Sequence, residues 1–256
     1  MIKGINGQTY IDLDKELDIS FLEKNIEKIY YSIARSKRIQ RDYSVENVHD
    51  KTTFIINKSK RKYSQVSNEK KIFDSTFDEQ LFYFLIFGDG NLCEMCYLRE
   101  SNTIPTTLGT INERHLSSSN KWTSNLNYFD YMIPFIKELP FKELGRILFF
   151  INYKDTKTPI HSDDGNAFSF DINHINPLNT QPHNREFIWF NLEKRKKFFL
   201  FDPIEKKKYF ISSSSAFFND SDYHGSEICN QFSVSLRIDG IFSDEFKTKL
   251  NLSSYL

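Results

Sequence analysis

Hydrophobic and polar residues follow two different patterns along the chain, and the first pattern has the spacing of a helix. Between residues 15 and 40, apolar side chains recur at mostly helical spacings with charged residues between them. These side chains are Leu17, Phe21, Ile26, Ile29 and Ile33. The pattern predicts an amphipathic helix or a pair of helices. Residues 129–145 predict a further helix, ended by Pro140 and Gly145.

The second pattern is that of short strands, and it dominates after residue 145. Aromatic and β-branched runs are separated there by turn residues. The runs are residues 146–153, 185–192, 196–202, 207–212, 215–220 and 232–239. So many strands close together predict an antiparallel sandwich or barrel, and a jelly roll is one way to close their edges.

The region before residue 130 is less regular. Residues 41–72 are polar and basic, with KSKRK at 58–62, and such a run is more typical of a solvated strand edge or loop than of a binding patch. Residues 78–98 predict an apolar element, a turn and a second apolar element. We therefore expect an α+β protein with a mainly β core at 131–256, and a helical or mixed, helix-rich region at 1–130 packed on it as part of the same globule.

Composition narrows the possible partners. The chain has 256 residues, with 34 basic and 34 acidic side chains and a formal net charge of zero, so nucleic acid and anionic membranes are not expected as main partners. Neither a secretory signal nor an uncharged apolar run long enough to span a membrane is found. A soluble, cytoplasmic protein is the expectation, and its oligomeric state stays open.

Three cysteines do not make a disulfide framework. Cys93 and Cys96 form one CxxC pair, but a structural zinc site needs a second pair and Cys229 is single. Buried thiols are therefore the favoured interpretation, with the role of the Cys93/Cys96 pair left open.

The strongest candidate chemistry lies in the stretch TPIHSDDGN at 158–166. It contains His161 and Asp163, and a second histidine, His224, follows another predicted strand after a short polar turn. Asp164 is an alternative to Asp163 as the carboxylate ligand. Neighbouring residues in an extended segment point to opposite faces, however, so only Asp163 shares a face with His161. Taken alone, a motif this short is weak support for a metal site.

The types of residue at these positions, and an arginine further along the chain, strengthen the interpretation as a metal site. Two imidazoles and one carboxylate on one face of a metal ion form the facial triad of non-haem Fe(II) oxygenases. Arg237 lies in an otherwise apolar predicted strand, where a buried guanidinium needs an anionic partner. A bidentate contact to the far carboxylate of a 2-oxo acid would provide that partner. Ser235 shares a face with Arg237 by strand alternation and could contact the same carboxylate.

These stretches together resemble the Fe(II)- and 2-oxoglutarate-dependent dioxygenases, especially the aspartyl/asparaginyl hydroxylase-like branch that includes proline hydroxylases. The resemblance is carried by GRILFFINYKDTKTPIHSDDG, NREFIWFNL, SSAFFNDSDYHGSE and FSVSLRIDG, and covers about residues 145–242. It implies a double-stranded β-helix (jelly roll, cupin-like), with iron bound by His161, Asp163 and His224. It also implies that Arg237 holds the co-substrate 2-oxoglutarate, with O₂ as the second co-substrate.

The resemblance implies a hydroxylase for an amino acid, an amino-acid derivative or a peptide side chain, releasing succinate and CO₂. Its substrate would therefore be a small molecule or a peptide. The loop around residues 166–185, with His174 and His183, is a candidate lid. Arg185 is a candidate for a substrate or co-substrate carboxylate, or for a surface ion pair. Two alternatives stay open: a cupin-like metal protein without O₂ chemistry, and a non-enzymatic interaction module.

Overall fold

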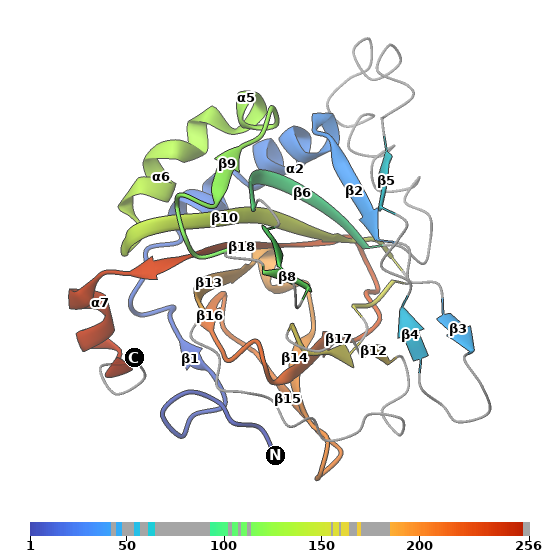
Figure 1. Ribbon diagram of the computed structural model, residues 1–256. Helices are drawn as coiled ribbons and strands as arrows, with labels where there is room; N and C mark the ends of the chain where they lie inside the picture. The colour runs from blue at the N-terminus through green and yellow to red at the C-terminus, as the bar shows by residue number, and fades with distance from the viewer. Residues whose placement is uncertain are drawn as a thin grey trace.

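The structure is a computed structural model. It describes residues 1–41, 93–101, 114–154, 156–158, 160–163 and 185–252, together with the short strands at 45–47, 54–56, 61–64, 104–106, 109–111 and 168–169. The described part of the chain is mostly β, with two antiparallel sheets and a few short helices (Figure 1).

The larger sheet has nine strands in the order β1-β16-β13-β18-β10-β6-β2-β5, with β9 paired to β6. Their bounds are β1 Ile11–Asp12, β2 Arg38–Arg41, β5 Arg61–Ser64, β6 Cys93–Ser101, β9 Asn120–Trp122, β10 Phe141–Asn152, β13 Glu186–Asn191, β16 Ser215–Phe217 and β18 Ser233–Phe242. Strands from before and after residue 130 therefore pair within one sheet.

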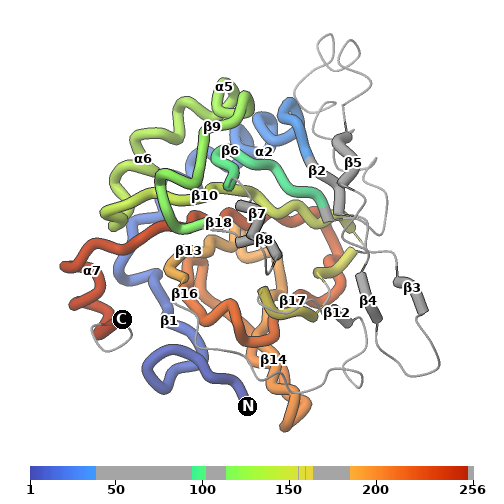
Figure 2. Tube along the Cα trace, viewed as in Figure 1, coloured from blue at the N-terminus to red at the C-terminus, as the bar shows by residue number. Residues whose placement is uncertain are grey.

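The smaller sheet has five strands in the order β12-β11-β17-β14-β15. Their bounds are β11 Ile160–His161, β12 Phe168–Ser169, β14 Phe198–Asp202, β15 Lys207–Phe210 and β17 Tyr223–Ser226. Two further hairpins are β3 Val45–Asn47 with β4 Phe54–Ile56, and β7 Ile104–Thr106 with β8 Gly109–Ile111. Figure 2 shows β13, β14, β16, β17 and β18 arranged in a ring.

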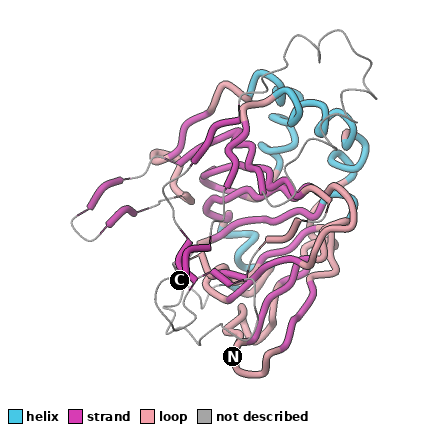
Figure 3. Tube along the Cα trace, turned by 90° about the vertical axis from the view of Figure 1, so that its right-hand side faces the viewer, coloured by secondary structure: helices cyan, strands magenta, loops and turns pink. Residues whose placement is uncertain are grey.

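The helices are short, and most of them lie on one face of the larger sheet (Figures 1 and 3). They are α1 Ser20–Lys24, α2 Ile26–Arg35, α5 Leu126–Phe129, α6 Ile133–Glu138 and α7 Asp244–Lys249, with 3-10 turns η1 Asp130–Met132 and η3 Leu192–Lys194. Ile29 and Phe135 from these helices join Phe149 and Leu236 of the sheet in the main apolar core. Burial of these apolar side chains between the helices and the sheet holds the helices in place.

Alternate residues of β10 face opposite ways, as strand geometry requires. Phe149 belongs to the main core under the helices, whereas Leu148 and Phe150 pack with Met95 and Tyr97. Leu148 is also the direct partner of Arg237 on β18. The face that carries Leu148, Phe150 and Arg237 is therefore the inner face, turned away from the helices.

The predicted helix at 129–145 is partly wrong. The helical turns end at Glu138, and β10 begins at Phe141, immediately after Pro140. Phe141 pairs with Phe242 of β18, and their rings stack with centroids 5.2 Å apart. A short apolar run does not distinguish strand from helix by spacing, and here the pairing with β18 decides.

The predicted strands after residue 145 are confirmed, but β17 was not among them. The N-terminal region is mixed rather than helix-rich in its described part, since β2 and β6 extend the larger sheet. The second half of the 78–98 prediction is β6, and its first half lies outside the described residues. Within the described part of the chain, no helix has the length and apolar character needed to cross a membrane.

Cys96 and Cys229 are both buried free thiols. Burial raises the pKa of Cys96 to about 12, which keeps the thiol protonated and unreactive near neutral pH. The prediction of buried thiols therefore holds for these two cysteines, and the side chain of Cys93 lies outside the described residues.

Candidate metal centre

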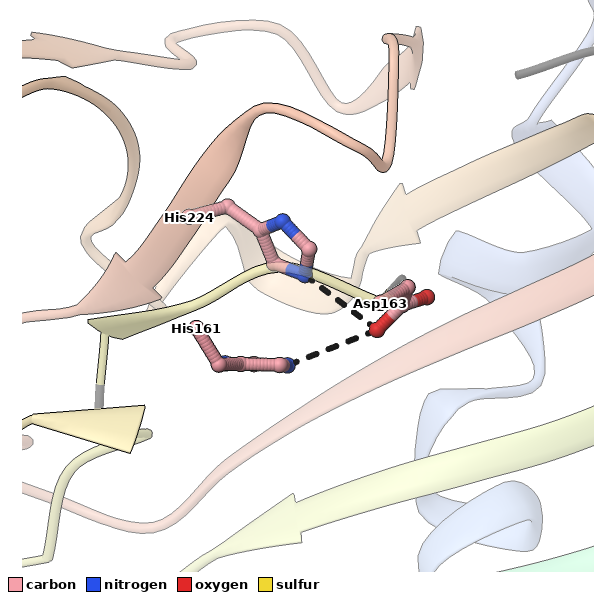
Figure 4. Close-up of side chains that lie close together, drawn as sticks. All are labelled: His161, Asp163 and His224. Atoms are coloured by element: carbon pink, nitrogen blue, oxygen red, sulfur yellow. Dashed lines mark ion pairs between the residues drawn. The ribbon is translucent and has the colours of Figure 1, made fainter. Parts of the chain in front are cut away.

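The smaller sheet brings two histidines together. His161 on β11 and His224 on β17 are direct partners across the two strands, and their ring centroids lie 4.3 Å apart. Asp163 follows β11, and its backbone N–H donates to the carbonyl of Asp220 at 3.0 Å. The ligand atoms of the three side chains all lie within 4.8 Å of one another (Figure 4). The predicted cluster is thus present in space as well as in sequence.

The two oxygens of Asp163 have different surroundings. Oδ1 lies 3.6 Å from Nε2 of His161 and 3.6 Å from Nε2 of His224. Oδ2 accepts from Nη1 of Arg114 at 2.9 Å and from Nη1 of Arg237 at 3.0 Å. The two guanidinium groups therefore orient the carboxylate so that its other oxygen faces the imidazoles.

The protonation states of two of these residues suit metal binding. His224 Nδ1 lies 2.8 Å from the carbonyl oxygen of Asp222, and since a carbonyl only accepts, the neutral ring carries its proton on Nδ1. Nε2 then has a free lone pair. Burial raises the pKa of Asp163, but Arg114, the two histidines and Arg237 lower it more, so this pKa lies well below its ordinary value. The carboxyl is thus an anionic ligand.

Arg237 is engaged by carboxylates on every nitrogen of its guanidinium group. Nε donates to Asp239 at 2.7 Å, and Nη2 donates to Asp220 at 2.6 Å. Nη1 makes the contact with Asp163 described above. Its guanidinium carbon also lies 3.7 Å from the centroid of the Phe187 ring. Burial by itself lowers the pKa of Arg237. The three aspartates raise this pKa by a larger amount, so the net change is upward.

Three more arginines complete a buried charge cluster. Arg146 Nε lies 2.7 Å from Asp239, Arg114 Nη2 lies 3.6 Å from Asp220, and Arg185 Nη1 lies 3.7 Å from the same Asp220 oxygen. The cluster thus contains the arginines 114, 146, 185 and 237 and the aspartates 163, 220 and 239. Counted over the described residues, this cluster has four cations and three anions, and therefore one excess positive charge.

The structure brings most of the predicted site residues together. His161, Asp163, His224 and Arg237 form one group, and Arg185 joins it through Asp220. Ser235 is fully buried two residues before Arg237, and its hydroxyl has no hydrogen-bond partner among the described residues. Asp164, His174 and His183 lie outside the described residues.

The sequence prediction missed Arg114, Asp220 and Asp239. Asp239 could have been found, because it lies two residues after Arg237 and strand alternation puts both on one face. Arg114 gave no comparable signal, since it lies 49 positions from Asp163. Its place depends on Gly145, where a Cβ would lie 2.1 Å from the Arg114 carbonyl oxygen. Only glycine permits this approach, in which the Arg146 N–H donates to that carbonyl at 2.7 Å.

We expect Arg114→Ala to weaken binding of a divalent metal ion about 10–100-fold, as loss of a group that orients a metal ligand usually does. The physical reason is that, among the residues the structure describes, Asp163 Oδ2 would keep only Arg237 as a guanidinium partner. The measurement is competition with a chelator on purified protein. Arg195→Ala is the control, because Arg195 pairs with Glu193 at a partly exposed surface site. Equal affinities of Arg114→Ala and wild type would contradict the orienting role.

No family model and no curated protein sequence matches the chain. Among solved structures, the chain is similar to an oxidoreductase of the 2OG-Fe(II) oxygenase family from Burkholderia pseudomallei, at 8% identity and a TM-score of 0.37. That overlap covers 57% of this chain and 67% of the other.

Two further similarities are of the same kind. The ribosomal oxygenase YcfD from Escherichia coli, in complex with cobalt and 2-oxoglutarate, is 10% identical with a TM-score of 0.34. The overlap covers 98% of this chain and 49% of YcfD, so the chain spans about half of that protein's length. A prolyl hydroxylase from Trichoplax adhaerens, bound to a peptide of hypoxia inducible factor, is 8% identical with a TM-score of 0.29, covering 93% and 98%. Overlaps this weak establish neither fold nor function, so the site geometry has to decide.

Proposed function

We propose that the protein is an Fe(II)- and 2-oxoglutarate-dependent oxygenase with a double-stranded β-helix core. The observation that carries the proposal is the convergence of His161, Asp163 and His224 on one point between the sheets. Two strands of the smaller sheet present the imidazoles side by side, and two buried arginines orient the carboxylate. A chance polar turn would not be supported in this way.

The donor set fits the proposed metal. Two imidazole nitrogens and one carboxylate oxygen on one face of a bound ion would leave adjacent positions for other ligands, as in the facial triad of Fe(II) oxygenases. The hydrogen bond from His224 Nδ1 to the Asp222 carbonyl leaves Nε2 as the donor atom for a metal, and the lowered pKa of Asp163 makes that carboxylate an anionic ligand. When bound, iron with 2-oxoglutarate and O₂ supplies an oxidant for unactivated C–H bonds, with release of succinate and CO₂.

The chain's own groups would orient the ligands and exclude water. The rings of Phe198 and Phe218 each lie 5.7 Å from the His224 ring, measured between centroids. These apolar neighbours shield one side of the imidazole, while Asp163 and the arginines supply the polar side. We extend the proposal to hydroxylation of an amino acid, an amino-acid derivative or a peptide side chain, on the basis of the motif resemblance.

The alternative is a cupin-like protein that binds a divalent metal without O₂ chemistry. One observation favours it: Arg237, expected to receive 2-oxoglutarate, is already engaged by Asp163, Asp220 and Asp239. Anaerobic titration of the metal-loaded protein with 2-oxoglutarate separates the two functions. The oxygenase binds the 2-oxo acid and loses this binding in His161→Ala, whereas the cupin-like alternative shows no binding in either protein.

A further inference from the structure

The loop at residues 218–222, between β16 and β17, lies against the segment that carries Asp163. The carbonyl oxygen of Asp220 accepts from the Asp163 N–H at 3.0 Å, and that of Ser221 accepts from the Ser162 hydroxyl at 2.8 Å. Asp220 and Ser221 are each only 1% exposed. The path of this buried loop therefore determines where Asp163 lies.

The next residue of the loop, Asp222, extends this arrangement to His224. Its carbonyl oxygen lies 2.8 Å from Nδ1 of His224, whereas Nε2 of the same ring is the atom that faces Asp163. A carbonyl in this position holds a metal-ligating imidazole in one orientation. Because the carbonyl belongs to the main chain, its position depends on what holds the loop at Asp222.

The side chain of Asp222 is held by two backbone N–H groups from a distant part of the sequence. The Lys3 N–H donates to Oδ1 and the Gly4 N–H donates to Oδ2, each at 2.8 Å. Asp222 is only 5% exposed, and hydrogen bonds to a buried carboxylate are among the stronger ones in proteins. The segment that supplies these N–H groups lies beside the smaller sheet, near β14 (Figure 1).

A tight turn at residues 4–8 fixes the direction of these N–H groups. Ile5 and Gln8 donate to each other's carbonyl oxygens at 2.8 and 2.9 Å, and the Ile5 side chain is buried in the main apolar core. Gly4 has φ +62°, and a Cβ at this position would lie 2.1 Å from the Gln8 carbonyl oxygen. The turn therefore requires glycine at position 4, and its anchoring in the core gives Asp222 a fixed support.

We propose that Asp222 is a positioning residue of the metal centre, and that the turn at residues 4–8 acts on His224 through it. The Asp222 carboxylate docks the loop on this turn, and the Asp222 carbonyl then orients the His224 ring. The preceding carbonyls of the same loop hold the Asp163 segment. This inference rests on the proposed function, because it concerns two ligands of the proposed metal ion.

The first test is the affinity for Mn(II), with free Mn(II) measured by its EPR signal. We expect Asp222→Ala to weaken binding about 10–100-fold, the usual effect of losing a group that orients a metal ligand. Asp202→Ala is the matched control and should bind Mn(II) like wild type. The Asp202 carboxylate accepts from the N–H of Ile2 in the same N-terminal segment, but its other backbone partners are residues 204 and 205 of the β14–β15 turn.

The second test approaches the same contact from the turn. Gly4→Ala should also weaken Mn(II) binding, because the added Cβ displaces the N–H that Asp222 accepts. Gly7→Ala is its control, since Gly7 also has a positive φ, +75°, but a Cβ there meets nothing within 4 Å. In the double variant, Gly4→Ala should add little to the effect of Asp222→Ala, because both substitutions break one interaction.

Two further readouts separate positioning from general stability. The thermal midpoint of the metal-free protein reports stability, and NMR of the imidazole nitrogens reports the His224 tautomer. We expect the tautomer with the proton on Nδ1 in wild type and a mixture in Asp222→Ala. Should Asp222→Ala not fold, Asp222→Asn carries the test, since it keeps one acceptor oxygen and should have an intermediate affinity.

Wild-type Mn(II) affinity in the folded Asp222 and Gly4 variants would overturn the inference, even if their thermal midpoints fall, and would leave the proposed function intact. A wild-type protein that does not bind Mn(II) would overturn the proposed metal centre and this inference with it.

Discussion

Replacement of His224 by alanine should lower the affinity for a divalent metal ion by more than about 100-fold, because loss of a ligand exceeds the 10–100-fold effect of losing a group that only orients one. His224 and His161 present Nε2 to the same oxygen of Asp163 at 3.6 Å each. With one imidazole removed, a bound ion would keep one nitrogen and one oxygen donor. Equilibrium dialysis with metal analysis measures the change.

The control for this variant is His49→Ala, which removes a histidine without a neighbouring ligand pattern. Since His224 also packs against Phe198 and Phe218, the thermal midpoint of the metal-free protein has to be compared as well. A folded His224→Ala protein with wild-type metal affinity would remove His224 from the metal centre.

Arg237→Ala should destabilise the fold by about 3–5 kcal/mol, the usual cost of breaking a buried ion pair by removal of one partner. The substitution leaves Asp163, Asp220 and Asp239 without their shared guanidinium partner. Arg237→Lys should not restore the loss, since a single ammonium group cannot donate in three fixed directions. Urea unfolding curves measure the difference in the free energy of unfolding, with Arg195→Ala as the surface control.

The opposite result is equally informative. An Arg237→Ala protein of unchanged stability, whose only defect is weak 2-oxoglutarate binding, would support the sequence-based prediction that Arg237 anchors the co-substrate.

Much of the candidate metal centre could be predicted because strands impose simple geometry. His161 and Asp163 lie two residues apart in an extended segment, so both reach the same side. His224 follows a predicted strand, and its pairing with His161 across β11 and β17 brings the predicted residues together. The order of motifs along the chain was enough to select these residues.

Other parts depended on contacts between distant segments, which no local pattern records. Pro140 ends the helix, but only pairing with β18 shows that residues 141–145 form a strand. The chain order did not reveal that Arg237 would be shared by three aspartates.

The most direct test of the central claim is succinate formation from 2-oxoglutarate by the Fe(II)-loaded protein in air. The proposed function predicts succinate in amounts that match the 2-oxoglutarate consumed, dependence on both iron and O₂, and loss of product in His161→Ala. Succinate formation that is equal in the wild-type and His161→Ala proteins, or absent from a wild-type protein shown to be loaded with iron, would contradict it.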